Sequence, residues 1–437
     1  MTWQLNRRSF VISSAASAAA LTGPGLAWSG NSSQVRVAVV GVAGRGASNL
    51  AGIAAAGAKV AYLCDVDEPR AAAARKQFPD AKFTKDFRTI LDSKDVDAFV
   101  ISTPDHTHFP AAALAMDAGM HVYCEKPLAH TVAESRILNN LARSKKRVTQ
   151  MGTQVHSENN YRRVVELIRA GAIGQVKEAH VWCAKSWGGD GKRPTDTPSI
   201  PEGLDYDLWV GPAAMRPYNK AHLPFEWRRW WDFGTGTLGD MGCHYLDLAF
   251  WALNLDHPIH VSATGSPVND EMAAKELTAT WKFDKRGNRN PVDLTWYDGG
   301  RKPDIKGILP WGDGVLFVGE KGMLQSNYGQ HAFIGLNAED AKKGLKIDPI
   351  AASPGHYVEF IKGIQGEGKP MCSFDYSGLL SEMVILGVVA YRAGVPFNWN
   401  GKAFLADQPK ATALLTKKYR APWDKELAKF MNMTQLS

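Results

Sequence analysis

Asp240 and His244 place a carboxylate and an imidazole at a spacing suited to acid-base chemistry. Residues four apart share one face of an α-helix, so both side chains can address the same small molecule. An imidazole can accept a proton near neutral pH, so His244 is a candidate general base, with Asp240 as its partner or as a ligand of a neighbouring hydroxyl. Asp247, three residues after His244, could orient the imidazole or simply face solvent. A helix-capping Asp240 and a structural His244 are the alternative interpretation.

A glycine-rich segment near the amino terminus has the spacing of a phosphate-binding loop. Residues 41–46 (GVAGRG) follow an apolar run and match GxGxxG, with Ala43 in the second glycine place. The first glycine permits a tight turn, a small second residue lets main chain approach a pyrophosphate, and the third lets helix pack on strand. Plain turns can share this pattern, so its context matters. The candidate cofactor-binding residues of this loop are Gly41, Ala43, Gly44, Arg45 and Gly46.

Asp65 ends the next apolar run, 19 residues after Gly46. At this spacing an acidic side chain in a dinucleotide-binding fold accepts hydrogen bonds from the adenine ribose hydroxyls. A carboxylate there repels a 2′-phosphate, so we expect NAD as the cofactor and NADP to be disfavoured. Asp67 competes for this role, and a solvated residue at a strand end is the other interpretation of Asp65.

The elements that must position these residues alternate in period along residues 35–151. Short apolar runs separated by Ala-rich amphipathic stretches lie at residues 35–40, 59–64, 98–102, 121–124 and 147–151. Alternating strand and helix periods predict βαβ units and a parallel sheet. We therefore predict an α/β protein whose residues 34–153 form a Rossmann domain with a doubly wound parallel sheet.

The pattern changes over residues 154–437. Strand-like runs follow at residues 176–182, 259–264, 277–283, 292–296 and 314–318. They predict a C-terminal α+β domain with a mainly antiparallel open sheet. Residues 185–236 are rich in Gly, Pro and Trp and lack a clear period, which is typical of a long functional loop. The tail, residues 375–437, could pack back on the Rossmann domain.

Residues 1–30 have the pattern of a twin-arginine export signal. Arg7 and Arg8 precede a weakly apolar, Ala-rich stretch, and cleavage is plausible after Ala27. An uncleaved membrane anchor is the alternative, but the apolar part is short for a bilayer of roughly 30 Å. No other segment is expected to approach the apolar length of a membrane span. We therefore expect an exported, periplasmic or extracytoplasmic protein.

Composition excludes several classes of function. The net charge is +7, but the basic residues are scattered rather than gathered in a stripe, so we expect no nucleic-acid partner. The five cysteines are far apart and form no CxxC pair, which favours buried thiols over disulfides and gives no sign of a metal site.

Four further segments resemble the glucose–fructose oxidoreductase, inositol dehydrogenase and MocA (Gfo/Idh/MocA) family. They are residues 103–108 (TPDHTH), 118–122 (AGMHV), 125–128 (EKPL) and 234–247 (GTGTLGDMGCHYLD). The resemblance is continuous over about residues 35–154 and looser in the C-terminal half. It implies that Thr103, Pro104, His106 and Glu125 border the nicotinamide ribose and that Lys126 lies beside the nicotinamide.

The same resemblance implies a substrate site in the second domain. It places Lys126, Asp240 and His244 at the reacting centre, and substrate contacts are expected at Gln154, His156, Tyr161 and Trp230. Flat aromatic faces can cover the C–H faces of sugars, so one or two tryptophans should line a carbohydrate cleft. The tryptophans near the second signature are Trp182, Trp187, Trp209, Trp227, Trp230, Trp231 and Trp251.

The expected function is hydride transfer between NAD and a hydroxyl of a sugar or sugar derivative. Because a nucleotide exported with the protein must be regenerated on it, we expect a tightly bound cofactor and either a ping-pong oxidoreductase or a redox-neutral glycosidase. The glycosidase would oxidise, eliminate, add water and reduce. A non-catalytic carbohydrate-binding relative is the third alternative. A small sugar or glycoside is the expected partner, and the resemblance implies a homo-oligomer.

Overall fold

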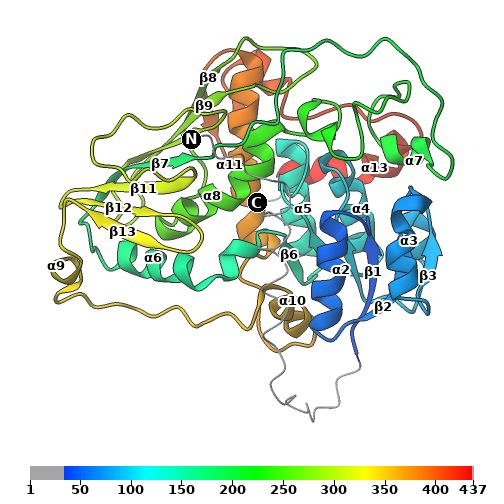
Figure 1. Ribbon diagram of the computed structural model, residues 1–437, viewed down its shortest axis with the longest axis horizontal. Coiled ribbons are helices and arrows are strands. Elements are labelled where there is room, and N and C mark those ends of the chain that lie inside the picture. Colours follow the sequence, from blue (N-terminus) through cyan, green and yellow to red (C-terminus); the bar gives the residue numbers. More distant parts are fainter. Residues whose placement is uncertain (1–33, 436–437) are drawn as a thin grey trace, which may run out of the picture. The chain divides into compact units, whose positions relative to one another are not determined.

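The computed structural model describes residues 34–435 of the 437-residue chain. The predicted export signal therefore lies outside the described residues. The described part contains two β-sheets, and helices connect and cover them (Figure 1).

The first sheet has six parallel strands in the order β3-β2-β1-β4-β5-β6. Its strands are β1 (Arg36–Val40), β2 (Lys59–Cys64), β3 (Lys82–Thr84), β4 (Ala98–Ile101), β5 (His121–Cys124) and β6 (Thr149–Met151). The helices between them are α2 (Arg45–Ala55), α3 (Glu68–Gln77), α4 (Asp105–Asp117) and α5 (Val132–Ser144), and the turn η1 (Phe87–Ile90) precedes β4. The strand order reverses between β1 and β4, which is where open α/β sheets bind ligands. The predicted Rossmann sheet is confirmed.

The second sheet has nine strands in the order β13-β12-β11-β7-β10-β9-β8-β14-β15. All neighbours are antiparallel except β10 and β7. The strands are β7 (Val176–Trp182), β8 (His260–Gly265), β9 (Leu277–Phe283), β10 (Val292–Tyr297), β11 (Gly314–Gly319), β12 (Met323–Ser326), β13 (His331–Ile334), β14 (Phe397–Asn400) and β15 (Leu405–Ala406). The mainly antiparallel second sheet agrees with the prediction.

One face of this sheet is covered by α8 (Gly236–Ala252) and α11 (Phe374–Ala393). The alternating burial of β9 follows from this arrangement, because every second side chain from Leu277 onward points into the core. The remaining helices are α6 (Asn159–Arg169), α7 (Tyr206–Val210), α9 (Ala338–Lys342), α10 (His356–Ile364), α12 (Pro409–Thr412) and α13 (Trp423–Leu427). Short 3₁₀ turns are η2 (Gln154–Ser157), η3 (Glu226–Arg229) and η4 (Ala428–Gln435).

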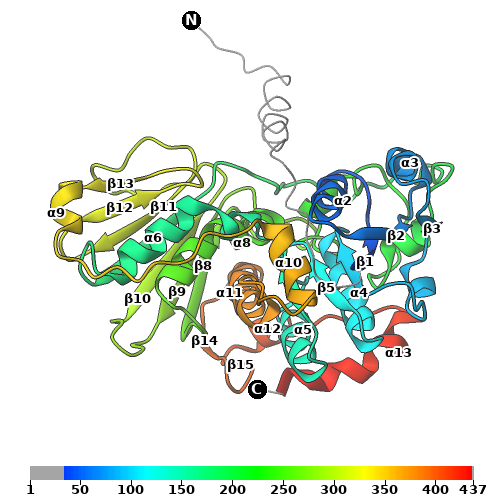
Figure 2. The ribbon, with the colours of Figure 1, turned by 90° about the horizontal axis from the view of Figure 1, so that it is seen from below.

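Helix α11 corrects one expectation from the sequence. It is 20 residues long, and by length and composition alone it is apolar enough to cross a membrane. No segment after the signal was expected to be so long and apolar. However, 83% of its apolar window is buried inside the protein. It lies between the second sheet and α5 of the first domain (Figure 2). Its apolar character is that of a core helix.

The C-terminal segment returns to the Rossmann domain. The ring of Tyr419 stacks on Phe109 of α4, and Asn140 of α5 donates a hydrogen bond to the main-chain oxygen of Met433. The five cysteines are all buried and free. The core therefore runs from the second sheet through α11 into the helices of the first sheet.

Candidate active site

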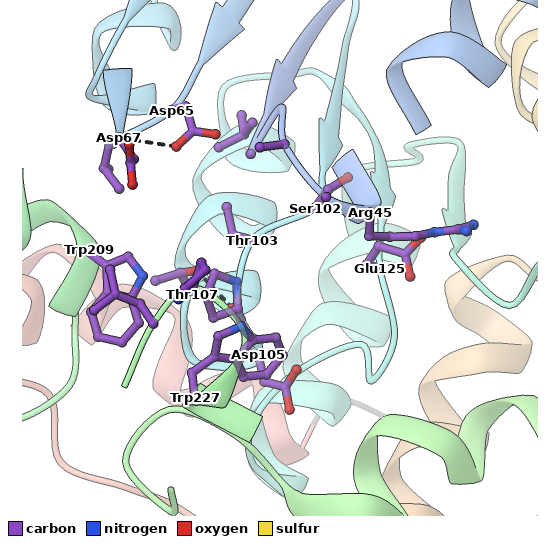
Figure 3. Close-up of a pocket in the computed structure, with 18 of the residues that line it drawn as sticks. Arg45, Asp65, Asp67, Ser102, Thr103, Asp105, Thr107, Glu125, Trp209 and Trp227 are labelled. Atoms are coloured by element: carbon purple, nitrogen blue, oxygen red, sulfur yellow. Dashed lines mark hydrogen bonds and ion pairs between the residues drawn. The ribbon is translucent and has the colours of Figure 1, made fainter. Parts of the chain in front are cut away.

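A cleft of about 740 Å³ opens at the carboxyl ends of the parallel strands. The residues after β1, β2, β4 and β5 all contribute to its wall, because parallel strands present the same end to one edge of the sheet. Helix α8 and the segment before it close the cleft from the second domain. Figure 3 shows Asp65 and Asp67 at one side of this space and Arg45 and Glu125 at another. The predicted site residues in the wall are Gly41, Ala43, Gly44, Arg45, Asp65, Thr103, Pro104, Glu125, Lys126, Gln154, Asp240 and His244.

The glycine loop has the geometry that its motif requires. Gly41 has a φ of 80°, and a Cβ there would lie 2.8 Å from the main-chain oxygen of Ser102. A Cβ on Gly46 would lie 1.9 Å from the oxygen of Gly41, so helix and strand are in direct contact there. Helix α2 begins at Arg45 with no side-chain cap, so the positive end of the helix dipole faces the loop and favours an anion there. The loop therefore fits the pyrophosphate of a dinucleotide, while Gly46 itself lies behind the cleft wall.

Asp65 lies beside this loop and also fixes it. One carboxylate oxygen accepts a hydrogen bond from the main-chain N–H of Val42 at 2.9 Å, and the other accepts from Asp67 N–H at 3.1 Å. Burial raises the pKa of Asp65, although these two hydrogen bonds oppose the shift. Asp67 also lines the cleft and caps α3 by accepting from the N–H of Arg70. Both carboxylates thus lie at the edge where the adenine ribose was expected.

Glu125 is the buried centre of a polar network. Its Oε1 accepts hydrogen bonds from Arg45 Nε at 3.1 Å, Asn49 Nδ2 at 3.0 Å and Gln154 Nε2 at 2.9 Å. Burial disfavours its charge, but the positive charges of Arg45 and Lys126 outweigh burial and lower its pKa to about 2. A Cβ on Gly152 would meet the Glu125 carboxylate at 2.5 Å, so this position needs glycine. Gln154 is therefore engaged with Glu125 as well as lining the cleft.

Lys126 forms an ion pair with Asp240 across the two domains. Its Nζ donates to Asp240 Oδ1 at 2.6 Å and to the Asp240 main-chain oxygen at 2.8 Å. Asp240 also accepts from Trp187 Nε1 at 2.8 Å and lies 3.1 Å from Arg228 Nε. Burial works against ionisation of Asp240, but Lys126 and Arg228 keep its pKa well below the usual range. The carboxylate therefore holds the ammonium in one place.

His244 follows Asp240 by one helical turn and lines the cleft. Its imidazole has no hydrogen-bonding partner among residues 34–435, so both ring nitrogens can serve a bound molecule. Burial and the nearby charge of Lys126 lower its pKa to about 3. The ring is therefore neutral at pH 7 and can accept or donate a hydrogen bond.

Asp105 and Arg228 are among the cleft residues that were not predicted from the sequence. Asp105 lies inside the TPDHTH segment, and its Oδ2 accepts a 2.7 Å hydrogen bond from Thr235 at the start of α8. Arg228 stands over the rings of Phe225 and Trp227, at 4.3 Å from each ring centre, and faces Asp240. Arg228 could have been proposed as a site residue from the sequence, because it is a charged residue within the aromatic WRRW run. Asp105 could also have been proposed from the sequence, because it is an acidic residue between the predicted cofactor contacts Pro104 and His106.

His106 and His156 lie outside the cleft wall, contrary to the expected contacts. His106 is fully buried, and its ring nitrogens contact the main-chain oxygens of Trp209 and Phe233. His156 contacts the Asp247 carboxylate at 3.0 Å and stacks on Trp251. Asp247 therefore orients His156 rather than His244. Both histidines contribute to packing around the site.

Tyr161 and Trp230 are also outside the cleft wall. Tyr161 donates its hydroxyl hydrogen bond to the main-chain oxygen of His244, so it supports the helix that carries the imidazole. Trp230 is buried and donates to the main-chain oxygen of Ala221. Of the tryptophans named above, Trp209 and Trp227 line the cleft. We therefore remove His106, His156, Tyr161 and Trp230 from the candidate contacts.

Two family models match the chain. Residues 35–153 match the NAD-binding Rossmann fold of the Gfo/Idh/MocA oxidoreductase family, and residues 172–289 match its C-terminal alpha/beta domain. The chain belongs to the Gfo/Idh/MocA family. Its Rossmann domain is therefore an NAD-binding domain, in agreement with the loop geometry.

Curated relatives of this Gfo/Idh/MocA protein include an inositol 2-dehydrogenase and a levoglucosan dehydrogenase. Inositol 2-dehydrogenase of Salmonella typhimurium is 30% identical over 150 residues, which are 33% of this chain and 45% of the relative. Levoglucosan dehydrogenase of Pseudarthrobacter phenanthrenivorans is 27% identical over 194 residues, which are 43% of this chain and 40% of the relative. The matches thus span less than half of the length of these relatives.

Solved structures of similar fold cover more of this family member. The WlbA dehydrogenase from Bordetella pertussis, in complex with NADH and UDP-GlcNAcA, has a TM-score of 0.62 at 18% identity and covers 84% of this chain and 98% of that chain. A levoglucosan dehydrogenase in complex with NADH and levoglucosan has a TM-score of 0.57 at 20% identity, with 84% and 99% coverage. At these identities the likeness concerns the two-domain fold.

Proposed function

We propose that this chain is an NAD-dependent oxidoreductase that acts on a hydroxyl of a sugar or sugar derivative. The observation that carries the proposal is the meeting of Lys126, Asp240 and His244 in one cleft with the glycine loop. Glu125 connects the glycine loop with the reacting centre. Its carboxylate forms an ion pair with Arg45 of the loop, and the next residue in the chain is Lys126. NAD⁺ would supply a hydride acceptor at this site.

The protein groups would hold the alcohol and move its proton. Lys126 Nζ, fixed by Asp240, is suited to donate a hydrogen bond to the reacting oxygen. His244 lines the cleft one helical turn after Asp240, and its imidazole has no hydrogen-bonding partner among residues 34–435, so we assign His244 as the acceptor of the hydroxyl proton. Arg228 and Trp227 form a polar and a flat apolar surface beside Asp240, which suits a polyhydroxylated ring.

Lys126→Ala and His244→Ala test this assignment. Each substitution should lower turnover by roughly 100-fold or more while the nucleotide stays bound, because neither side chain belongs to the glycine loop or the Asp65 edge. Turnover is measured on inositols, anhydrosugars and aldoses, and nucleotide is measured by mass spectrometry after denaturation. Wild-type turnover in both variants would refute the assignment. His331→Ala is the matched control, because His331 is a partly exposed histidine on β13. His108→Ala would be a weaker control, because His108 is buried.

The first test of the cofactor cycle is to measure the NAD content of the purified protein. We propose that NAD copurifies with it and is regenerated by a second sugar in a ping-pong reaction. Near-stoichiometric NAD in protein purified without added nucleotide supports this cycle. Protein that is empty but binds NAD reversibly indicates a conventional dehydrogenase, and protein that cannot bind NAD overturns the proposed function.

A redox-neutral glycosidase is the second candidate, because it would also use a retained nucleotide and the same acid-base residues. Product analysis distinguishes the two activities. The oxidoreductase yields an oxidised sugar, whereas the glycosidase releases a free sugar from a glycoside without net change in NADH absorbance. Aryl glycosides incubated in deuterated water add a second readout, because elimination and water addition would exchange a ring proton.

We also propose export by the twin-arginine route, on the basis of the Arg7–Arg8 pair. The double substitution Arg7→Lys with Arg8→Lys should leave the protein in the cytoplasmic fraction. Fractionation and immunoblotting of the two proteins measure this. Equal periplasmic amounts would contradict the proposal.

A further inference from the structure

A segment of the second domain crosses to the nucleotide edge of the first. Residues 203–209, here called the strap, lie between β7 and α8 in sequence but run beside α3 in space, as Figure 1 shows near α7 and Figure 2 shows as green ribbon near α3. Leu204 forms an antiparallel bridge with Asp67. Asp205 N–H donates to the Val66 main-chain oxygen at 2.8 Å, and Glu68 N–H donates to that of Gly203 at 3.2 Å. The strap is therefore hydrogen-bonded to the residues that follow Asp65.

The other end of the strap is fixed to two more elements. Asp205 caps α7 by accepting from the N–H of Leu208 at 3.0 Å. The main-chain oxygen of Trp209 contacts His106 Nε2 at 2.9 Å, which ties it to α4. Arg420 of the C-terminal segment donates to the main-chain oxygens of Asp207 and Gly211, each at 2.7 Å. Three separate attachments hold the strap over the edge of the cleft.

The strap gives this edge an apolar wall. Leu208 and Trp209 line the cleft together with Val66, Asp67 and Phe87. The indole of Trp209 is held by rings on two sides, because it stacks on Tyr206 at 5.6 Å and meets Phe233 edge-on at 4.8 Å. Trp209 is therefore preordered in the same cleft wall as Val66 and Asp67, and the part of its indole that lines the cleft is suited to the flat face of a purine.

We infer that the strap forms the outer wall of the adenosine site, with Trp209 as the aromatic surface for the adenine, and that it keeps the dinucleotide from leaving. This inference rests on the proposed function, because it places the adenosine at the Asp65 edge of an NAD site. It assigns the second domain a part in cofactor retention.

Trp209→Ala tests the inference by nucleotide release. Nucleotide-free protein is loaded with NADH, and the loss of bound NADH fluorescence is followed after excess NAD⁺ is added. The dissociation rate should rise by about 10-fold or more, because stacking of a base on an aromatic ring holds the adenine in place. Trp209→Phe should restore slow release in large part. Trp311→Ala is the control, since Trp311 is a partly exposed tryptophan outside the cleft wall, and its release rate should remain near that of the wild type.

Binding of the two halves of the dinucleotide, measured separately, shows which half Trp209 contacts. By calorimetry, Trp209→Ala should weaken binding of AMP about 10-fold and leave binding of nicotinamide mononucleotide unchanged. Leu208→Ala, which removes a half-buried side chain, should act in the same direction and serves if Trp209→Ala fails to fold. Release rates equal to the wild type in variants that fold would overturn the inference while leaving the proposed function standing. Failure of the wild-type protein to bind NAD at all would overturn the proposed function itself.

Discussion

Buried charges around Lys126 are paired, and this pairing fixes the geometry of the site. Asp240 faces both Lys126 and Arg228, and Glu125 faces Arg45. Removing one partner of a buried pair leaves an uncompensated charge, which is costly. Asp105 differs, because its Oδ2 accepts a hydrogen bond from the neutral hydroxyl of Thr235, and its Oδ1 is buried without a partner in the described part of the chain.

Asp105 should therefore make stability depend on pH. Burial raises its pKa to about 7; Asp240 adds to the shift, while Thr235, Lys126 and Arg228 oppose it. Below about pH 4 Asp105 is protonated in both folded and unfolded protein, and above pH 7 it is ionised in both. Between these values the unfolded chain loses the proton first, so the wild type loses stability as pH rises.

Asp105→Asn removes this titration and keeps an oxygen for Thr235. Its free energy of unfolding, relative to the wild type, should increase between pH 4 and pH 7 and then level off, by at most roughly 4 kcal/mol at about 1.4 kcal/mol per pKa unit. Urea unfolding at pH 5 and pH 8 measures the difference. Asp92→Asn, at an exposed position of the same domain, is the control. A difference that does not grow with pH would contradict the prediction.

At the scale of elements, the glycine loop and the strand ends were predictable because their signals are local. The loop motif, the spacing to Asp65 and the alternation of strand and helix lie within short stretches of sequence. β3 was missed because three residues carry too little periodicity. The contacts of His156 with Asp247 and of Tyr161 with His244 join residues more than 80 positions apart. No local pattern reveals such pairs, so both side chains were expected at the substrate rather than in the supporting structure.

Gly46→Ala tests how tightly α2 must sit on β1. Because the new Cβ would overlap the main-chain oxygen of Gly41, the helix has to move away from the loop. We expect a destabilisation of about 1–3 kcal/mol, as for overpacking, and a loss of NAD binding. Gly329→Ala is the matched control, since no heavy atom lies within 4 Å of its Cβ position, and should change stability by less than about 0.5 kcal/mol. Thermal unfolding and NADH titration measure both variants; normal NADH binding by Gly46→Ala would contradict the loop assignment.

At the scale of the whole described chain, α11 joins the two domains. It packs on α8, β8 and β9 of the second domain and on α5 of the first. The same hydrophobic cluster contains residues of both sheets, including Phe99 of β4 and Trp281 of β9. Cooperative unfolding follows from a shared core, because neither sheet can lose its covering helices without exposing the other. We therefore expect one unfolding transition for the two domains.

Two arginines of α5 provide a matched pair of variants to test this coupling, because each forms an ion pair with an acidic residue of α11. Arg136 makes two hydrogen bonds to Glu382, at 2.8 and 2.6 Å, and both side chains are buried. Arg143 lies 2.6 Å from Asp375, but its side chain is 50% exposed. Arg136→Met leaves a buried carboxylate with His257 as its remaining partner, so it should cost about 3–5 kcal/mol, whereas Arg143→Met should cost less than about 1 kcal/mol. Calorimetry should show one transition for each variant, shifted strongly for Arg136→Met alone. Equal shifts, or two separate transitions in the wild type, would show that the α5–α11 contact does not couple the domains.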